Sequence, residues 1–400
     1  MKIIKGGITA PLGFRAAGIA AGLKKSGRKD LALIFSVVPA VACGAFTANK
    51  IKAAPVVLCR RKLSGNRAQA VLVNSGNANC FTGKEGLKDA ENLTKLLASS
   101  LNISPQESLM ASTGVIGHRL PVTKIKSKLG ALIGKLSRNA GRNAALAIMT
   151  TDTRPKEIAV KLKIGKNIIK IGGIAKGAGM ISPRMATMLC FITTDASIAP
   201  PALKSALKKA LESSFNCVSV DGDMSTNDSL IIMANGFAGN KRIGNNTKYF
   251  ESFQKGLSFV MGALAKMIAK DGEGASKFIE IKALGAKSAG DAKKAAEKIA
   301  NSPLVKTAIY GDDPNWGRIA AALGASGAIF NPDRIDIALG DKCVVKNGVP
   351  VKVNKSALRA AVSKKDVFIT VNLKSGKGNA RVWTCDLTDS YIHINARYET

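Results

Sequence analysis

The chain has 400 residues, of which 46% are apolar and 22% charged, so it is too apolar for a disordered protein and long enough for one large or two medium domains. Lys and Arg outnumber Asp and Glu by 60 to 27, a net charge of +33, but the basic residues are spread along the whole chain. Because aromatic residues make up only 5% and no nucleic-acid-binding motif is present, we favour a solvated basic surface over a nucleic-acid-binding site.

The cysteine spacing and the least charged stretch of the chain bear on its location. The seven cysteines are widely spaced without a CxxC pair, which favours buried thiols in a reducing cytoplasm over a zinc site or disulfides. The first 15 residues contain no continuous apolar run, so we expect no signal peptide. Residues 31–49 are long enough to raise the question of a membrane span, but Pro39 and Gly44 interrupt them. We expect a buried strand, a loop and a second short element there, in a cytoplasmic protein without a membrane span.

Strand-like and helix-like segments alternate in the first part of the chain, which is typical of an α/β protein. Short apolar runs predict strands, and apolar residues spaced three and four apart predict helices. The predicted strands are residues 31–35, 70–73, 108–112, 157–162 and 168–171, and the predicted helices are residues 87–99 and 122–136.

The most informative segment, residues 176–196, begins with a Gly-rich basic stretch and ends in an apolar run that predicts a strand. Between them the small residue Ala186 directly precedes the hydroxyl residue Thr187. In a strained loop this hydroxyl can attack the preceding carbonyl, and the new chain would begin at Thr187. Its freed α-amine would lie within reach of its own hydroxyl, so one residue would supply both nucleophile and base. An Ala-Thr step alone is more often plain core sequence.

Other catalytic bases are scarce in this chain. The two histidines, His118 and His393, lie in no motif of a nucleophile paired with histidine. Cys190 is close to Thr187 in sequence, but its apolar neighbours favour a buried strand position.

The carboxy-terminal half continues the α/β pattern. Pro200 is expected to open a helix, residues 249–269 form a long one, and an acidic Gly-rich loop follows at residues 271–274. Beyond about residue 285 the alternating runs indicate a smaller α/β domain. Its predicted elements are strands at residues 334–338, 367–373 and 391–395, a helix at residues 318–323 and an Asn-Gly hairpin turn at residues 346–349.

Residues 111–117 end a predicted strand in a Gly-containing turn, which can be purely structural. The functional alternative is an oxyanion hole, in which the Thr113 hydroxyl and the Gly114 N–H point at one developing negative charge. Glycine permits the close backbone approach that such a site needs.

Three other polar or Gly-rich segments have weaker functional explanations. Residues 177–179 resemble the start of a dinucleotide loop but lack its third glycine. Residues 220–228 are rich in oxygen ligands but lack the spacing of a calcium loop, so we expect a polar active-site or turn loop. Residues 312–318 lead into a predicted helix, and helix capping explains them equally well.

Taken together, these segments resemble the ornithine acetyltransferase (glutamate N-acetyltransferase) family of arginine biosynthesis over nearly the whole chain. Residues 176–196 carry the most specific part of the resemblance. The other matching segments are residues 6–11, 74–79, 112–114, 219–228, 313–318 and 394–398.

The resemblance implies a four-layer α/β/β/α sandwich similar to self-processing hydrolases with an N-terminal nucleophile, plus a smaller α/β domain. We accordingly expect a main domain at residues 1–284, the smaller domain at 285–387 and a tail at 388–400 that returns to the active site. Cleavage between Ala186 and Thr187 is implied, with the two fragments associated as a heterotetramer of two of each.

The resemblance also implies the active-site residues. Thr187 would be the acetyl-accepting nucleophile, and Thr113 and Gly114 the oxyanion hole. The implied substrate-binding residues are Thr150, Lys176, Thr187, Glu273, Asn395 and Thr400. Their chemistry agrees with this, because lysine can bind a carboxylate, glutamate an amine, and asparagine and threonine a backbone-like group.

The implied reaction is ping-pong transfer of the acetyl group of N2-acetylornithine to glutamate, without a metal or organic cofactor. The enzyme is expected also to accept acetyl-CoA as a poorer donor, which would make it bifunctional. Three alternatives stay open: a single-function form without acetyl-CoA activity, a related self-processing aminopeptidase-like hydrolase, and a basic nucleic-acid-binding protein. The expected partners are therefore small molecules, with neither nucleic acid nor membrane among them.

Overall fold

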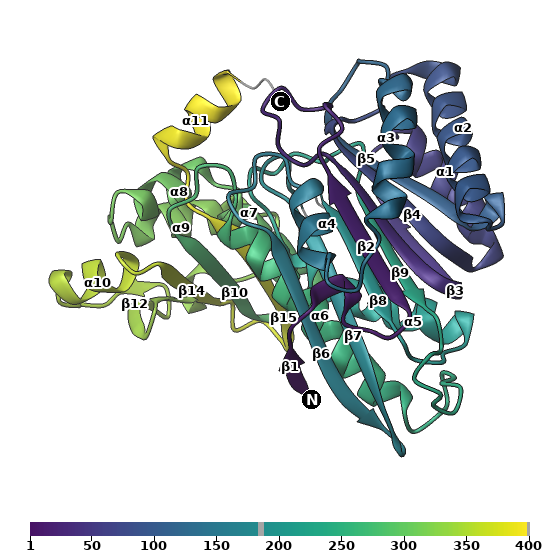
Figure 1. The fold of residues 1–400 in the computed structure, drawn as a ribbon. Helices are drawn as coiled ribbons and strands as arrows, with labels where there is room; N and C mark the ends of the chain where they lie inside the picture. The colour runs from purple at the N-terminus through teal and green to yellow at the C-terminus, as the bar shows by residue number, and fades with distance from the viewer. Residues whose placement is uncertain (183–187, 398–400) are drawn as a thin grey trace.

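The computed structural model describes residues 1–182 and 188–397, and within them a nine-stranded mixed sheet forms the larger part of the fold (Figure 1). Its strands are β1 (Lys2–Ile4), β2 (Phe14–Ile19), β3 (Leu31–Phe46), β4 (Arg67–Asn77), β5 (Ser108–Val115), β6 (Lys156–Ile164), β7 (Asn167–Lys176), β8 (Leu189–Thr194) and β9 (Ser229–Ala234). They lie in the order β1-β6-β7-β8-β9-β3-β4-β5, and β2 pairs with β3.

The long strand β3 joins two halves of this sheet. Its first part pairs with β2 and β4, and its second part pairs with β9, with a register shift between Phe35 and Ala40. The prediction of a loop within residues 31–49 was wrong, because β3 runs from Leu31 to Phe46. Pro39 lies within the register shift, where its missing N–H costs no ladder bond, so the strand continues through the proline.

Six helices accompany this sheet in the described residues before Asp271: α1 (Ala54–Lys62), α2 (Gly83–Leu101), α3 (Val122–Gly134), α4 (Gly141–Ala147), α5 (Pro200–Glu212) and α6 (Phe250–Lys270). They confirm the helices expected at residues 87–99, 122–136, from Pro200, and at 249–269.

Alternating side chains of the strands fill three successive apolar layers. Between the two halves of the sheet, Ile34 of β3 shares a buried cluster with Phe191 of β8. On the outer face of one half Leu33 packs with the helices α2 and α3. On the outer face of the other half Ile192 packs with α5 and α6, through residues such as Leu264. The order helix, sheet, sheet, helix confirms the predicted four-layer sandwich.

A six-stranded second sheet forms the rest of the described fold, in the order β13-β12-β11-β14-β10-β15. Its strands are β10 (Phe278–Ala286), β11 (Asp336–Leu339), β12 (Lys342–Lys346), β13 (Val349–Pro350), β14 (Asp366–Asn372) and β15 (Gly378–Cys385). The helices near it are α7 (Ala289–Ala300), α8 (Pro303–Tyr310), α9 (Trp316–Gly324) and α10 (Lys355–Val362). Residues of this sheet and of α7 to α10 bury a separate apolar cluster. The exact domain limits at residues 284 and 387 stay predictions.

Local predictions in this part were mostly confirmed. The Asn-Gly turn joins β12 and β13, and both Asn347 and Gly348 have positive φ, as a two-residue hairpin requires. The strand expected at residues 391–395 was wrong, because α11 (Asp389–Ala396) is a helix. Ile392 is 63% exposed, so the alternating pattern meets no sheet edge with which it could pair. Nowhere in residues 1–182 and 188–397 is there a helix of the length and hydropathy that crossing a membrane requires.

Candidate active site

A cavity of about 340 Å³ lies where the ends of β5 and β7 meet the loop before β9 and the helix α11. Its lining includes every predicted site residue that the structure describes: Thr113, Gly114, Thr150, Lys176, Glu273 and Asn395. Ala186, Thr187 and Thr400 lie outside the described residues. The fold therefore brings six predicted residues from five separate segments to one place, although their catalytic and binding roles stay predictions.

Thr113 and Gly114 lie at the end of β5, opposite Ser75 and Gly76 of the parallel strand β4. Gly114 has φ +136°, and a Cβ there would lie 2.3 Å from the carbonyl carbon of Gly76. Only glycine fits such a close approach of two backbones. The neighbouring Ser112 hydroxyl donates to Asn74 Oδ1 at 2.6 Å, which adds a side-chain hydrogen bond between β5 and β4 beside Thr113.

Lys176, the last residue of β7, is only 2% exposed, and its Nζ lies 3.4 Å from the Thr113 hydroxyl. Burial lowers the pKa of Lys176, an effect that Asp152 opposes and Lys156 adds to. Opposite Lys176 in the β7–β8 ladder is Leu189, two residues after Thr187. The buried Lys176 amine thus lies beside the candidate oxyanion-hole hydroxyl, and in its protonated form it would favour a bound anion.

Glu273 supplies the opposite charge in the same cavity. Its Oε1 accepts a hydrogen bond from the Thr151 hydroxyl at 2.7 Å, and its Oε2 accepts one from Asn395 Nδ2 at 2.9 Å. A Cβ at residue 179 would lie 2.2 Å from Glu273 Oε2, so Gly179 makes room for the carboxylate. Separated positive and negative groups suit a small ligand that carries both a carboxylate and an amine.

A buried ionic network lies beside this cavity, next to Lys176 and Thr150. Lys156 is 1% exposed, and its Nζ lies 2.5 Å from both Asp152 Oδ1 and Asp271 Oδ2. Asp152 in turn accepts hydrogen bonds from the N–H groups of Thr150 and Gly177. Burial alone would raise the pKa of Asp152, but Lys156 and Lys176 together lower it. The network fixes the backbone beside Lys176 and at Thr150.

Replacing Lys156 by alanine should destabilise the fold by about 3–5 kcal/mol, because two buried carboxylates would lose their shared cation. Urea unfolding followed by circular dichroism measures this change. The exposed Lys163 on the same strand is the matched control, and Lys163→Ala should stay within about 0.5 kcal/mol of wild type. Equal stabilities of the two variants would contradict the assigned role of Lys156.

Sequence reasoning missed this network and several lining residues. Asp152 and Lys156 belong to no recognisable motif, Asp271 begins the acidic Gly-rich loop at residues 271–274 without a role assigned to it, and Thr151 adjoins a predicted residue without a signal of its own. Asn227 lies in the loop that the sequence analysis expected to be a polar active-site or turn loop, and it does line the cavity. These contacts join segments that are distant in the sequence, so no local sequence pattern predicts them.

Two structural explanations from the sequence analysis were confirmed. The Asp221 carboxylate accepts hydrogen bonds from the N–H groups of Met180, Ile181 and Asp223, so it organises a turn in the 220–228 loop. Asn315 caps the helix α9 by accepting from the Arg318 N–H, as the capping alternative for residues 312–318 expected.

Cys190 is not a competing nucleophile. It is a fully buried residue of β8, and burial raises the pKa of its thiol well above the usual range. The thiolate is the reactive form, so this environment keeps the residue inert.

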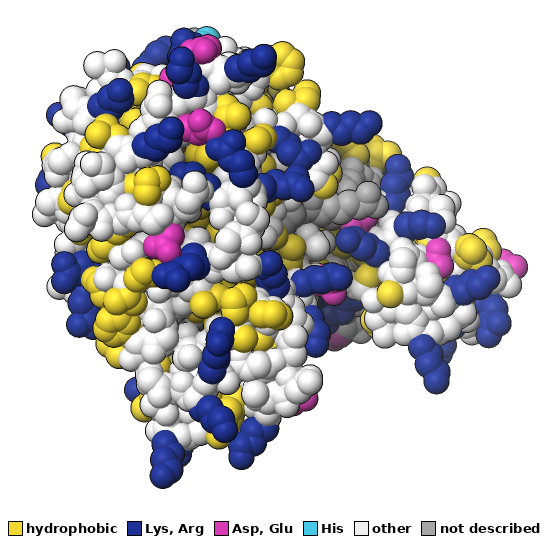
Figure 2. Space-filling model, turned by 90° about the vertical axis from the view of Figure 1, so that its right-hand side faces the viewer, with side chains coloured by type: hydrophobic (Ala, Val, Ile, Leu, Met, Phe, Trp, Pro, Cys, Tyr) yellow, Lys and Arg dark blue, Asp and Glu magenta, His cyan; other side chains and the backbone are white. Residues whose placement is uncertain are grey.

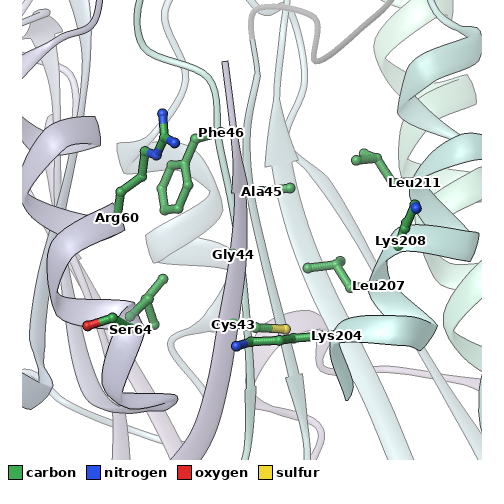
Figure 3. A pocket seen from close by; sticks show the side chains of 11 residues that line it. Cys43, Gly44, Ala45, Phe46, Arg60, Ser64, Lys204, Leu207, Lys208 and Leu211 are labelled. Atoms are coloured by element: carbon green, nitrogen blue, oxygen red, sulfur yellow. The ribbon is translucent and has the colours of Figure 1, made fainter. Parts of the chain in front are cut away.

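A second cavity, of about 410 Å³, lies between α1, α5 and the second part of β3 (Figure 3). The three charged residues of its lining are cations, Arg60, Lys204 and Lys208. Cys43 and Ser64 also line it, and burial raises the pKa of the Cys43 thiol to about 12. Lacking an activated nucleophile and a carboxylate, this lining is less suited to chemistry than the cavity at Lys176 and Glu273.

The surface charge agrees with the distribution of basic residues in the sequence. Figure 2 shows Lys and Arg side chains scattered over the visible face, with apolar and uncharged surface between them. Nucleic-acid-binding surfaces usually gather such residues into one patch or stripe. This face therefore resembles a solvated basic surface.

The fold and the cavity define an α/β/β/α sandwich protein with a small, charged site at the edge of its sheets. The chain belongs to the ArgJ family, whose model matches residues 15–400. It is 48% identical over 402 residues to the arginine biosynthesis bifunctional protein ArgJ of Symbiobacterium thermophilum, covering 100% of both chains. It is 46% identical over 412 residues to a glutamate N-acetyltransferase of Methanocaldococcus jannaschii, again covering 100% of both.

A solved structure agrees with these relatives. The chain is similar to the arginine biosynthesis bifunctional protein ArgJ of Bacillus halodurans, with 43% identity and a TM-score of 0.50. The match covers 97% of that chain but only 52% of this one.

Proposed function

We propose that this protein is a self-cleaving acetyltransferase that moves the acetyl group of N2-acetylornithine to glutamate in arginine biosynthesis. The observation that carries the proposal is that two buried residues of opposite charge type, Lys176 and Glu273, line one small cavity. Thr113 and Gly114 line the same cavity. Family membership over residues 15–400 supports it, as do relatives named for this pathway and for glutamate N-acetylation.

Substrate binding follows from the two charges. The Lys176 ammonium would bind the α-carboxylate of acetylornithine, and the Glu273 carboxylate would bind the amine at the other end. Thr150 and Asn395 line the same cavity and would hydrogen-bond the polar groups between these ends. We propose that Thr400, by analogy with the family, completes this set.

Acetyl transfer would proceed in two displacements. The Thr187 α-amine takes the proton of the Thr187 hydroxyl, and that oxygen attacks the acetyl carbonyl. The Thr113 hydroxyl and the Gly114 N–H stabilise the resulting oxyanion. The carbon–nitrogen bond then breaks, ornithine leaves with the proton, and acetyl-Thr187 remains. The glutamate amine attacks this ester, restores the Thr187 hydroxyl and leaves as N-acetylglutamate.

Self-cleavage between Ala186 and Thr187 would create the required α-amine. The solved Bacillus halodurans chain supports this step, because nearly all of it corresponds to about half of the present chain. The fragments would stay associated, since β7 and β8 precede and follow the cleavage site and pair from Ile171 and Thr194 to Lys176 and Leu189. We propose that two copies of each fragment form a heterotetramer in the cytoplasm.

An assay with purified protein tests the function directly. N2-acetylornithine and glutamate should yield ornithine and N-acetylglutamate in equal amounts, measured by chromatography and mass spectrometry. Release of acetate without N-acetylglutamate would instead identify the aminopeptidase-like hydrolase. No consumption of acetylornithine by cleaved protein would refute the proposal.

Acetyl-CoA should acetylate Thr187 more slowly than acetylornithine does. A thioester is chemically more reactive, but a cavity of about 340 Å³ cannot hold the whole CoA molecule. Most of CoA must therefore stay outside and contribute little binding energy to the transition state. Mass spectrometry of the fragment starting at Thr187, mixed with each donor and no acceptor, measures both rates. Acetylation by acetylornithine alone, from milliseconds to hours, would establish the single-function form.

A further inference from the structure

The loop of residues 20–30, which joins β2 to β3, packs against the end of β4 beside the candidate oxyanion hole. Gly76 of β4 is the partner of Gly114 in the β4–β5 ladder. A Cβ at Gly76 would lie 3.1 Å from the Leu23 carbonyl oxygen and 3.2 Å from Lys24 Cγ. The loop therefore comes close to the backbone on which the candidate oxyanion hole rests, although the sequence analysis assigned it no role.

A buried carboxylate fixes the shape of this loop. Asp30 is fully buried, and its Oδ1 accepts from the Ala21 N–H at 2.6 Å. Its Oδ2 accepts from the N–H groups of Leu23 and Lys24, at 2.6 and 3.1 Å. The Asp30 carbonyl also accepts from the Ser75 N–H at 2.9 Å, which ties the loop to β4. Because its backbone is held at both ends, the loop presents the Lys24 side chain in a defined place.

The half-buried Lys24 side chain connects this loop with a distant segment of the chain. Its Nζ donates to the carbonyl of Lys29 at 2.9 Å and to the carbonyl of Met149 at 2.7 Å. Burial lowers the pKa of Lys24 to about 8, an effect that Asp30 opposes and Lys176 adds to. At about pH 7 the ammonium form therefore still predominates, and both hydrogen bonds are charge-assisted.

The peptide group between Met149 and Thr150 is held by charged side chains on both sides. Its carbonyl accepts from Lys24 Nζ, and its N–H donates to Asp152 Oδ2 at 3.0 Å. A peptide group is planar, so these two bonds together fix its orientation. Thr150 and Thr151, the two residues that follow Met149, both line the cavity at Lys176. The orientation of this one peptide group therefore controls where the Thr150 hydroxyl lies.

We propose that Lys24 is a positioning residue for substrate binding, whose ammonium group holds the Met149–Thr150 peptide so that the Thr150 hydroxyl faces bound acetylornithine. This inference rests on the proposed function, in which Thr150 hydrogen-bonds the substrate. Lys24 is not part of the cavity lining and acts through the Met149 carbonyl. A hydrogen bond made to substrate and transition state alike lowers KM without raising kcat, so Lys24 should affect mainly KM.

The first test is Lys24→Met, which keeps a long apolar side chain but removes the hydrogen-bond donors. In the cleaved variant at about pH 7 we expect KM for N2-acetylornithine to rise about tenfold, with kcat within about twofold of wild type. The matched control is Lys124→Met. Lys124 Nζ also donates to a backbone carbonyl of this loop, that of Gly22 at 3.2 Å, and has no contact with Met149. The control should keep the wild-type KM.

A double-mutant cycle with Thr150→Val separates positioning of Thr150 from a general loosening of the fold. Valine has nearly the shape of threonine but no hydroxyl, so Lys24 would have no substrate contact left to position. In the Thr150→Val background, Lys24→Met should raise KM by no more than about twofold further. If Lys24 merely stabilises the fold, the effects of the two substitutions on KM should instead multiply.

The outcomes separate the inference from the function on which it rests. Inactivity of cleaved wild type would overturn the proposed function. An active wild type together with an unchanged KM in Lys24→Met, or with effects that multiply in the cycle, would overturn the role of Lys24. If Lys24→Met does not fold, Lys24→Ala leaves space for water to hydrogen-bond the two carbonyls. That variant should show the same rise in KM, and a wild-type KM would reject the positioning role.

Discussion

Replacement of Thr187 by alanine is expected to leave one uncleaved 400-residue chain without acetyl transfer. Alanine has no hydroxyl to attack the Ala186 carbonyl, and no oxygen to accept the acetyl group afterwards. Denaturing electrophoresis should show a single band where wild type gives fragments of residues 1–186 and 187–400. Amino-terminal sequencing of the second wild-type fragment should start at Thr187.

Thr187→Ser is the matched control, since it keeps a hydroxyl at the same position. It should still be cleaved and retain part of the transferase activity. An active wild-type enzyme that is never cleaved would contradict this account. So would residual transfer by Thr187→Ala at the wild-type rate.

Thr113→Ala should lower kcat by about 10²–10³-fold, the usual cost of removing one oxyanion-hole donor. Substrate affinity should change little, because the oxyanion develops only in the transition state. The neighbouring Lys176 would keep its charge for the substrate carboxylate. Steady-state kinetics of the cleaved variant measure kcat and KM separately.

Thr113→Ser provides the comparison, because it retains the hydroxyl without the methyl group. We expect it to recover most of the lost kcat. If cleaved Thr113→Ala turns over as fast as wild type, the Thr113 hydroxyl is not an oxyanion donor. Loss of cleavage in this variant would show that the same hydroxyl also serves processing, which can be measured as the rate of fragment appearance.

The sequence by itself determined most of the local elements and named six residues that the structure brings to one cavity, although their roles stay predictions. The strand at residues 70–73 and the helix at residues 249–269 follow from apolar spacing, and the structure has β4 and, shifted by one residue, α6 there. The resemblance over nearly the whole chain implied Thr113, Glu273 and the other site residues. Six predicted residues then met in one cavity.

Contacts between distant segments were decided only by the tertiary structure. The alternating tail at residues 391–395 is a helix, because a strand needs a neighbouring edge and Ile392 has none in the described fold. Pro39 does not end β3, because the sheet accommodates it in a register shift.

The buried contacts beside the site show most clearly what local sequence patterns do not predict. Lys156 is an unremarkable lysine among 60 basic residues in the sequence, yet in the fold it is 1% exposed between two carboxylates. Asp228 lies 40 positions along the chain from Met188 and still binds its N–H. Local patterns encode which face of an element is apolar, whereas burial and pairing of charges depend on which elements pack together, and only the folded chain fixes that.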